Sequence, residues 1–160
     1  MVSRAISAFL AVTMLSVAAA GEARTQEART WLFDDSTDVS ALKYGTPETD
    51  DLVIAISCEP GAKTMRIVEF VGSSNLTPGS STRLRLTSGG TSVDYPGQAI
   101  ANEMDGTVNI EVTTAIDPKL FALLKAGPSL TIAVGGKQLT VPLKAAVPHI
   151  APFEKACLRR

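Results

Sequence analysis

Short runs in which apolar and polar positions alternate recur along this chain, and they predict a mainly β fold. Every second residue from Leu52 to Cys58 is a large apolar residue or a cysteine, so these side chains share one face of a strand. A second run at 64–71 is rich in β-branched residues. Because Pro60-Gly61 lies between the two runs, we expect them to form a hairpin.

Turn-forming residues divide the rest of the chain into further short strands. Gly135-Gly136 is a two-residue turn between two alternating runs, and Pro142 in the second run indicates an edge strand. We expect one strand to end at Pro96-Gly97. The expected strands cover 82–86, 91–95, 108–113, 130–134 and 139–143, with 98–104 left ambiguous. Seven or eight short strands predict an antiparallel β-sandwich or barrel.

The hydrophobic period changes at two places, which predicts two short helices. Asp117 is an N-cap candidate, and Pro118 suits the first helical position. Pro152 is expected to open a second, C-terminal helix, in which Phe153 and Cys157 are four residues apart and share one face.

The N-terminus has the pattern of a secretory signal peptide. Residues 1–20 carry Arg4, then an uncharged and largely apolar run, and end in three alanines that suit a cleavage site. The run is too short for a membrane-spanning helix. Residues 21–30 are polar and without periodicity, so we expect a flexible leader before a single β-rich domain at 31–160.

The chain has two cysteines, Cys58 and Cys157. In an exported protein such a pair indicates a disulfide. The alternative is a reactive thiol, which needs a neighbouring base or cation to lower its pKa, and the sequence places none beside either cysteine.

Composition excludes several classes of function. The 160 residues suit one domain, and a net charge of −1 provides no basic surface for nucleic acid. With 19% charged residues and a mean hydropathy of +0.18, the chain is neither a disordered acidic segment nor a membrane bundle. We expect no membrane span after signal cleavage.

Residues that could carry catalysis do not form a recognisable site. His149 is the single histidine, and no nucleophile or orienting carboxylate can be assigned to it, so we interpret it as a surface or cap residue. The sequence contains no motif for a metal or a cofactor, and we expect neither. The acidic turns with Asp34, Asp35, Asp38, Asp50 and Asp51 lack the spacing of a calcium loop.

Two groups of charged residues remain as candidates. Arg83 and Arg85 project from one face of a strand, and Arg66 could join them if its strand is a neighbour; such a face could bind a carboxylate or a phosphate, or could simply face water. Asp94 and Glu111 exemplify a carboxylate pair for a small hydrolase, which would need a shared cleft and one raised pKa.

The last third of the chain resembles small exported proteins of Gram-negative bacteria. The resemblance lies in the helix PKLFALLKAG, the hairpin LTIAVGGKQLTVPL and a terminal helix with Phe153 and Cys157, together with Trp31 and Cys58. The type VI secretion-associated VasI-like and the invasion-associated locus B-like families share parts of this layout. The resemblance implies export, a β-rich fold and a disulfide, and no activity.

We therefore expect a periplasmic or secreted protein that binds an envelope protein partner without catalysis, as a binding or accessory module. The alternatives are a small hydrolase that uses a carboxylate pair, and a structural protein that self-associates through an exposed strand edge. The oligomeric state is not determined by the sequence.

Overall fold

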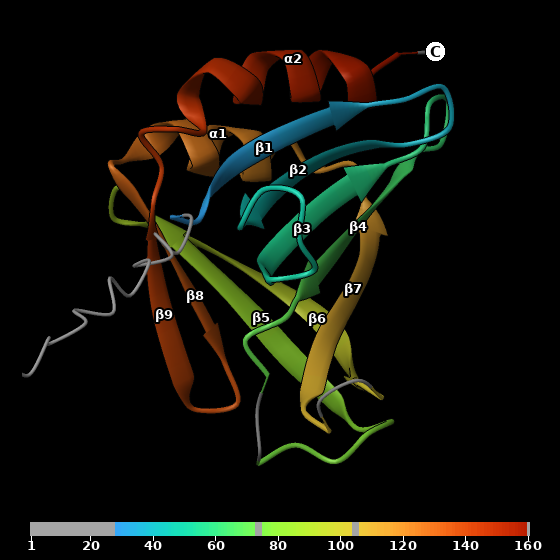
Figure 1. Cartoon of the computed structure of the whole chain (residues 1–160), viewed down its shortest axis with the longest axis vertical. Coiled ribbons are helices and arrows are strands. Elements are labelled where there is room, and N and C mark those ends of the chain that lie inside the picture. Colours follow the sequence, from blue (N-terminus) through green and yellow to red (C-terminus); the bar gives the residue numbers. More distant parts are fainter. Residues whose placement is uncertain (1–27, 73–74, 104–105, 160) are drawn as a thin grey trace, which may run out of the picture.

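The computed structural model describes residues 28–72, 75–103 and 106–159, which form one antiparallel sheet and two helices (Figure 1). The sheet has nine strands in the order β1-β2-β3-β4-β7-β6-β5-β8-β9. The strands are β1 (Thr30–Asp35), β2 (Ser40–Gly45), β3 (Leu52–Cys58), β4 (Thr64–Glu69), β5 (Ser81–Ser88), β6 (Thr91–Ala101), β7 (Val108–Ala115), β8 (Ser129–Val134) and β9 (Lys137–Pro142). The helices are α1 (Pro118–Ala126) and α2 (Val147–Cys157).

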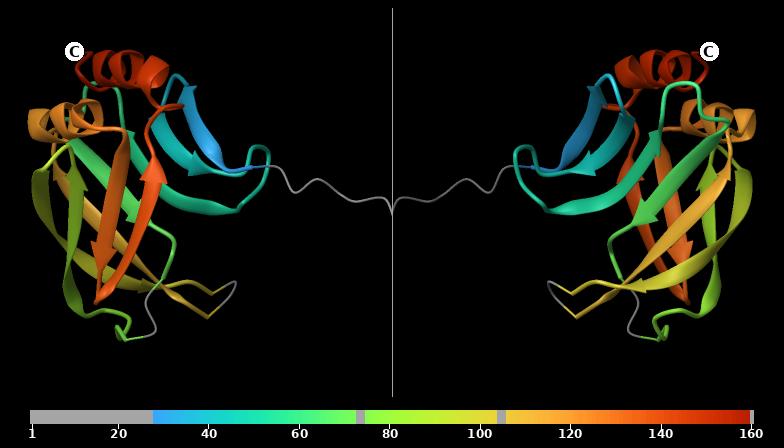
Figure 2. Two further views of the ribbon diagram at one scale, coloured as in Figure 1. Left: turned by 90° about the vertical axis from the view of Figure 1, so that its left-hand side faces the viewer. Right: turned by 90° about the vertical axis from the view of Figure 1, so that its right-hand side faces the viewer.

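The sheet curls into a half-barrel, and the two helices lie together over one end of it (Figure 2). The alternation predicted from the sequence fills its concave side, because every second side chain of each strand points inward. The residues that fill this core are fully buried and almost all apolar; they include Ile56, Ile67, Leu84, Leu86, Ile110, Phe121, Leu130 and Phe153. The mainly β, antiparallel fold with two helices is confirmed.

The strand count is nine because the N-terminal part contributes a hairpin that the sequence analysis did not assign. β1 and β2 pair from Thr30 opposite Gly45 to Asp35 opposite Ser40. The two edge strands of the sheet, β1 and β9, meet at one point, where the indole N–H of Trp31 donates to the carbonyl oxygen of Pro142 at 2.7 Å. The prediction that the strand with Pro142 is an edge strand is confirmed.

β6 corrects the prediction that a strand ends at Pro96-Gly97. It runs through both residues from Thr91 to Ala101 and includes most of the stretch that was left ambiguous. β5 pairs with β6 without interruption from Ser81 to Ser88, and this long ladder holds β6 extended across the proline.

The start of α1 follows the prediction. The Asp117 side chain accepts a hydrogen bond from the backbone N–H of Lys119 at 2.9 Å, and Pro118 occupies the first turn. The other Asp117 oxygen accepts from the Tyr95 hydroxyl at 2.9 Å. One carboxylate therefore caps the helix and connects it to β6.

The start of α2 does not follow the prediction. The helix begins at Val147 with Pro148 in its first turn, and Pro152 lies inside it. Pro152 cannot donate the usual intrahelical hydrogen bond, which costs stability. Packing offsets this cost, because the Phe153 ring makes edge-on contacts with Phe121 at 5.9 Å and Phe33 at 6.2 Å between centroids.

A disulfide joins Cys58 on β3 to Cys157 at the end of α2, as the sequence predicted. Two further contacts fasten the same end of the chain. The backbone N–H of Gly61 donates to the Arg159 carbonyl at 3.3 Å, and the Arg159 guanidinium pairs with Asp35. The C-terminal helix is thus fixed to both neighbouring hairpins.

The expected signal peptide and residues 21–27 of the expected leader lie outside the described residues. At the end of the leader, the Arg29 guanidinium binds the Asp51 carboxylate through two hydrogen bonds of 2.8 and 2.9 Å. Within residues 28–72, 75–103 and 106–159, neither helix has the length and apolarity that crossing a membrane requires.

Candidate functional site

The strand order decides whether Arg66 joins Arg83 and Arg85, which the sequence left conditional on their strands being neighbours. Arg66 lies on β4, whereas Arg83 and Arg85 lie on β5. Because β7 and β6 lie between these two strands, Arg66 does not extend the ladder of the other two. All three side chains are on the convex, outer face of the sheet, since Met65, Ile67, Leu84 and Leu86 fill the inner face.

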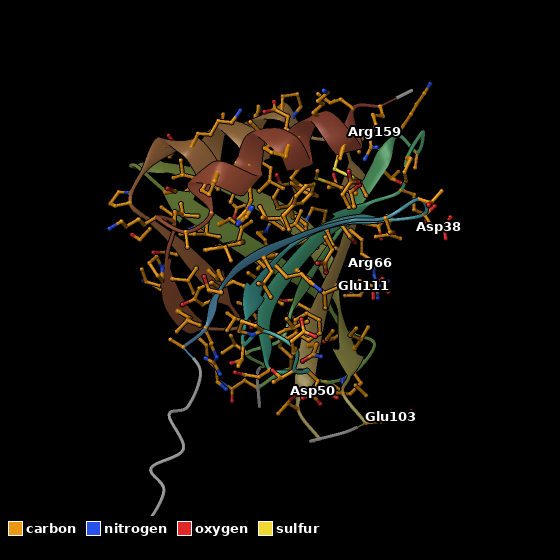
Figure 3. All side chains as sticks on the ribbon, turned by 45° about the horizontal axis from the view of Figure 1, so that its top comes forward. Asp38, Asp50, Arg66, Glu103, Glu111 and Arg159 are labelled. Atoms are coloured by element: carbon orange, nitrogen blue, oxygen red, sulfur yellow. A yellow bond between two sulfur atoms is a disulfide. The ribbon has the colours of Figure 1, made fainter. Side chains whose placement is uncertain are left out.

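Two of the three arginines are occupied by carboxylates on the neighbouring strand. Arg66 pairs with Glu111 on β7 at 2.5 Å, and Figure 3 shows the two side chains pointing toward one another. Arg85 pairs with Asp94 on β6 through hydrogen bonds of 2.8 and 3.0 Å. Among the described residues, Arg83 has no ion pair within 4 Å.

These pairs also decide against the carboxylate pair as a hydrolytic site. Glu111 lies opposite Gln98, and Asp94 is four residues further along β6, which is about 13 Å of strand, beyond the ~5–9.5 Å of glycosidase pairs. The guanidinium of Arg66 lowers the pKa of Glu111, and that of Arg85 lowers the pKa of Asp94. A general acid needs the opposite shift. The raised pKa that the hydrolase alternative requires is therefore not found at Asp94 or Glu111, the pair named as its example.

The sheet opens between the two ion pairs, in its middle. β6 and β7 pair only from Gln98 opposite Glu111 to Ala101 opposite Val108. Past Gln98 the ladder ends although Gly97 still lies close to β7; farther on, β6 continues along β5 and β7 along β4, and the two strands separate (Figure 1). We name this opening the β6–β7 split.

Pro96 explains why the ladder stops where it does. The backbone N–H of Ala99 donates to the Ser80 carbonyl at 2.9 Å, so Ala99 directs its backbone groups toward β5. Backbone direction alternates along a strand, and Gln98 and Pro96 therefore face β7. Gln98 is the last partner of β7 on this strand, and Pro96, the next residue on that side, has no N–H to donate.

Gly97, the first residue past the last paired position, keeps β6 close to β7 at the narrow end of the split. A β-carbon at this position would lie 2.9 Å from the Glu111 carbonyl oxygen and 2.9 Å from a methyl group of Val112. Any other residue would have to displace the β7 backbone, so the turn-forming pair Pro96-Gly97 shapes the split without ending the strand.

A hollow of about 480 Å³ lies on the outer face at the base of the split. We name it the β6–β7 hollow; its lining is Ser81, Pro96, Gly97, Gln98, Ile100, Glu111 and Thr113. The lining combines two hydroxyl groups, an amide and a carboxylate with the apolar surface of Pro96 and Ile100. Such a surface offers hydrogen-bond donors and acceptors but no nucleophile with an activating base.

A buried carboxyl group on the inner face was missed by the sequence analysis. Glu69 is only 3% exposed; one of its oxygens accepts from the backbone N–H of Val71 at 2.7 Å, and the other has no hydrogen-bond partner in the described part of the chain. Burial raises the pKa of Glu69. The signal was present, because Met65, Ile67 and Glu69 alternate on one face of β4.

The remaining candidates are dispersed. His149, on α2, lies beside the Phe33 ring with 6.5 Å between centroids. Asp34, Asp35 and Asp51 pair with Lys43, Arg159 and Arg29 respectively. Asp38 and Asp50 lie far apart in Figure 3. Within the described ranges, no three His, Cys, Asp or Glu residues are grouped as metal ligands.

Comparisons with known proteins give no further assignment: no family model, curated protein or solved structure matches this chain.

Proposed function

We propose that this protein is an exported, non-enzymatic binding module of the cell envelope that holds a protein partner at the β6–β7 hollow. The observation that carries the proposal is the opening of the sheet at this point. A sheet normally pairs its strands to satisfy their backbone groups. Here the ladder stops in the middle of the sheet and leaves a hollow with polar lining on the outer face.

The ion pairs beside the hollow support binding over catalysis. Asp94 and Glu111 each accept hydrogen bonds from an arginine, so the carboxylates are held ionised and oriented. A carboxylate in this state can receive a hydrogen bond from a partner but cannot act as a proton donor near neutral pH. The hydrolase alternative therefore has no support at this pair.

Export is supported by two independent features. The first twenty residues have the charge and hydropathy pattern of a secretory signal. The Cys58–Cys157 disulfide is typical of an oxidising compartment, since cytosolic thiols are kept reduced. A periplasmic or secreted location agrees with both features. We also propose that the chain is related to the VasI-like and invasion-associated locus B-like proteins, a resemblance that implies export.

Capture from the native envelope tests the proposal. The tagged protein without residues 1–20 is cross-linked in envelope extract, and captured proteins are quantified by mass spectrometry. Thr113→Arg places a long cation in the hollow, and Thr91→Arg is the matched control at an exposed position at the far end of β6. Circular dichroism checks that both variants are folded.

We expect one protein to be captured by the unmodified protein and by Thr91→Arg, and at least tenfold less of it by Thr113→Arg. Equal capture by both variants would show that the hollow is not the binding surface. Capture of nothing but further copies of this chain would favour the self-association alternative, and no capture at all by folded protein would remove the binding module.

A further inference from the structure

We propose that the partner segment at the β6–β7 hollow is an extended peptide that pairs with β7 as an added strand, through the backbone of Thr113 and Ala115. This inference rests on the proposed function and specifies the chemistry of the partner. It follows from the direction of backbone groups along the two sides of the split.

The backbone of β7 provides complete pairing groups that face the split. The backbone N–H of Ile116 donates to the Lys63 carbonyl at 2.9 Å, so Ile116 faces β4. By alternation, Thr113 and Ala115 face away from β4 and toward β6. β6 provides neither residue with a ladder partner, because the described β6–β7 ladder ends at Glu111.

The β6 side of the split is a poorer partner for a strand. Pro96 directs its carbonyl toward the split but has no N–H to donate. Asp94 is therefore the nearest residue of β6 that offers the split both a backbone donor and a backbone acceptor. The Asp94 side chain is also bound to Arg85. An added strand would thus gain both donor and acceptor at two successive positions of β7 and only one acceptor at Pro96.

The side chains that border the split are exposed to solvent. β6 and β7 are interior strands of the sheet, but four of their residues at the split are exposed: Asp94, Pro96, Thr113 and Ala115. Gln98 and Glu111 close the base of the split, so a peptide would enter from its wide end and stop at the hollow. Main-chain pairing supplies affinity in this mode, and the polar lining at Ser81 and Gln98 favours small polar side chains.

Hydrogen exchange in the free protein is the first part of the test. We expect the amides of Thr113 and Ala115 to exchange at least tenfold faster than those of Val112 and Thr114, which face β4. Equal protection of all four amides would show that the split is closed by other hydrogen bonds, and it would overturn the inference without any ligand.

The second part uses a peptide probe. A display library of random heptapeptides is selected on the protein without residues 1–20 and counter-selected on Thr113→Arg. The enriched heptapeptide is expected to slow exchange at Thr113 and Ala115 at least tenfold while Thr91 stays unchanged. N-methylation of alternate peptide amides should reduce affinity at least tenfold in one register and leave it unchanged in the other.

The outcomes separate this inference from the proposed function. Partner capture that is lost in Thr113→Arg, with no new protection of Thr113 and Ala115 in the complex, would retain the hollow as a binding surface and overturn strand pairing. A library that yields no peptide distinguishing the protein from Thr113→Arg would also overturn strand pairing. Equal capture by Thr113→Arg and Thr91→Arg would overturn both.

Discussion

Reduction of the disulfide should destabilise this protein strongly, because Cys58 and Cys157 are 99 residues apart. In the chain-entropy model, closing a loop of this length removes enough freedom from the unfolded chain to stabilise the fold by about 4.7 kcal/mol. For a folded part of roughly 130 residues, about 2.1 cal/mol/K of unfolding entropy per residue converts this into a loss of about 17 °C in Tm.

Trp31 makes the measurement direct. It is the single tryptophan of the chain and is 2% exposed, so its fluorescence reports unfolding in urea. Oxidised protein and protein in dithiothreitol are compared at the same pH. The variant Cys58→Ala/Cys157→Ala should lose somewhat more than the reduced protein, because both sulfur atoms are buried and alanine leaves space behind.

A loss below about 1 kcal/mol on complete reduction would refute the reasoning from loop length. It would mean that the unfolded chain already keeps the segments around Cys58 and Cys157 close together. Alternatively, the contacts of Arg159 with Gly61 and Asp35 would hold the end of α2 in place without the covalent link. Alkylation with and without reduction tests the premise, since two modified cysteines without reduction would exclude the disulfide itself.

Three further substitutions test individual contacts. Burial raises the pKa of Glu69, so the folded state favours the protonated form and loses stability as pH rises above about 4.5 through the folded-state pKa. In urea titrations, Glu69→Gln should therefore gain stability relative to the unmodified protein between pH 4 and pH 7.5. A stability difference that stays constant over this range would contradict the assignment. Hydrogen bonds from Arg29 and Thr46 lower the pKa of Asp51 to about 2, so the stability this carboxylate contributes is present above about pH 3.8 and lost toward pH 2. The loss of unfolding free energy in Asp51→Asn should therefore shrink between pH 5 and pH 2. Asp50→Asn, at a neighbouring exposed residue, is the control. Tyr95→Phe removes the hydroxyl that donates to the helix-capping Asp117 and should cost about 1 kcal/mol, measured as free energy of unfolding; no loss would show that water replaces this contact fully.

Local rules predicted much of the fold because they act over a few residues. The alternation at β3, β8 and β9 reflects the period of a strand, and Asp117-Pro118 reflects the needs of a helix N-terminus. Local rules failed where contacts with another element supplied the stabilisation. Pro152 lies inside α2 because aromatic packing holds the helix, and β6 continues through Pro96 because the ladder with β5 holds it extended.

The candidate site was predictable only in its parts. Arg66, Arg83, Arg85, Asp94 and Glu111 were all recognised from the sequence as charged residues on strands. Which of these charges meet was left conditional, because register and strand order decide it, and β7 and β6 lie between the strand of Arg66 and that of Arg83 and Arg85. Arg66 meets Glu111 and Arg85 meets Asp94 across neighbouring strands, far apart in the chain in the first case.

By itself, the sequence determined a mainly β chain with two helices, an edge strand at Pro142 and a cysteine pair suited to a disulfide, since these depend on side-chain period, backbone donors and covalent chemistry. The tertiary structure alone decided where the sheet opens. A proline anywhere in a strand removes one N–H, but only the strand order shows that the N–H missing at Pro96 is the one that would have faced β7.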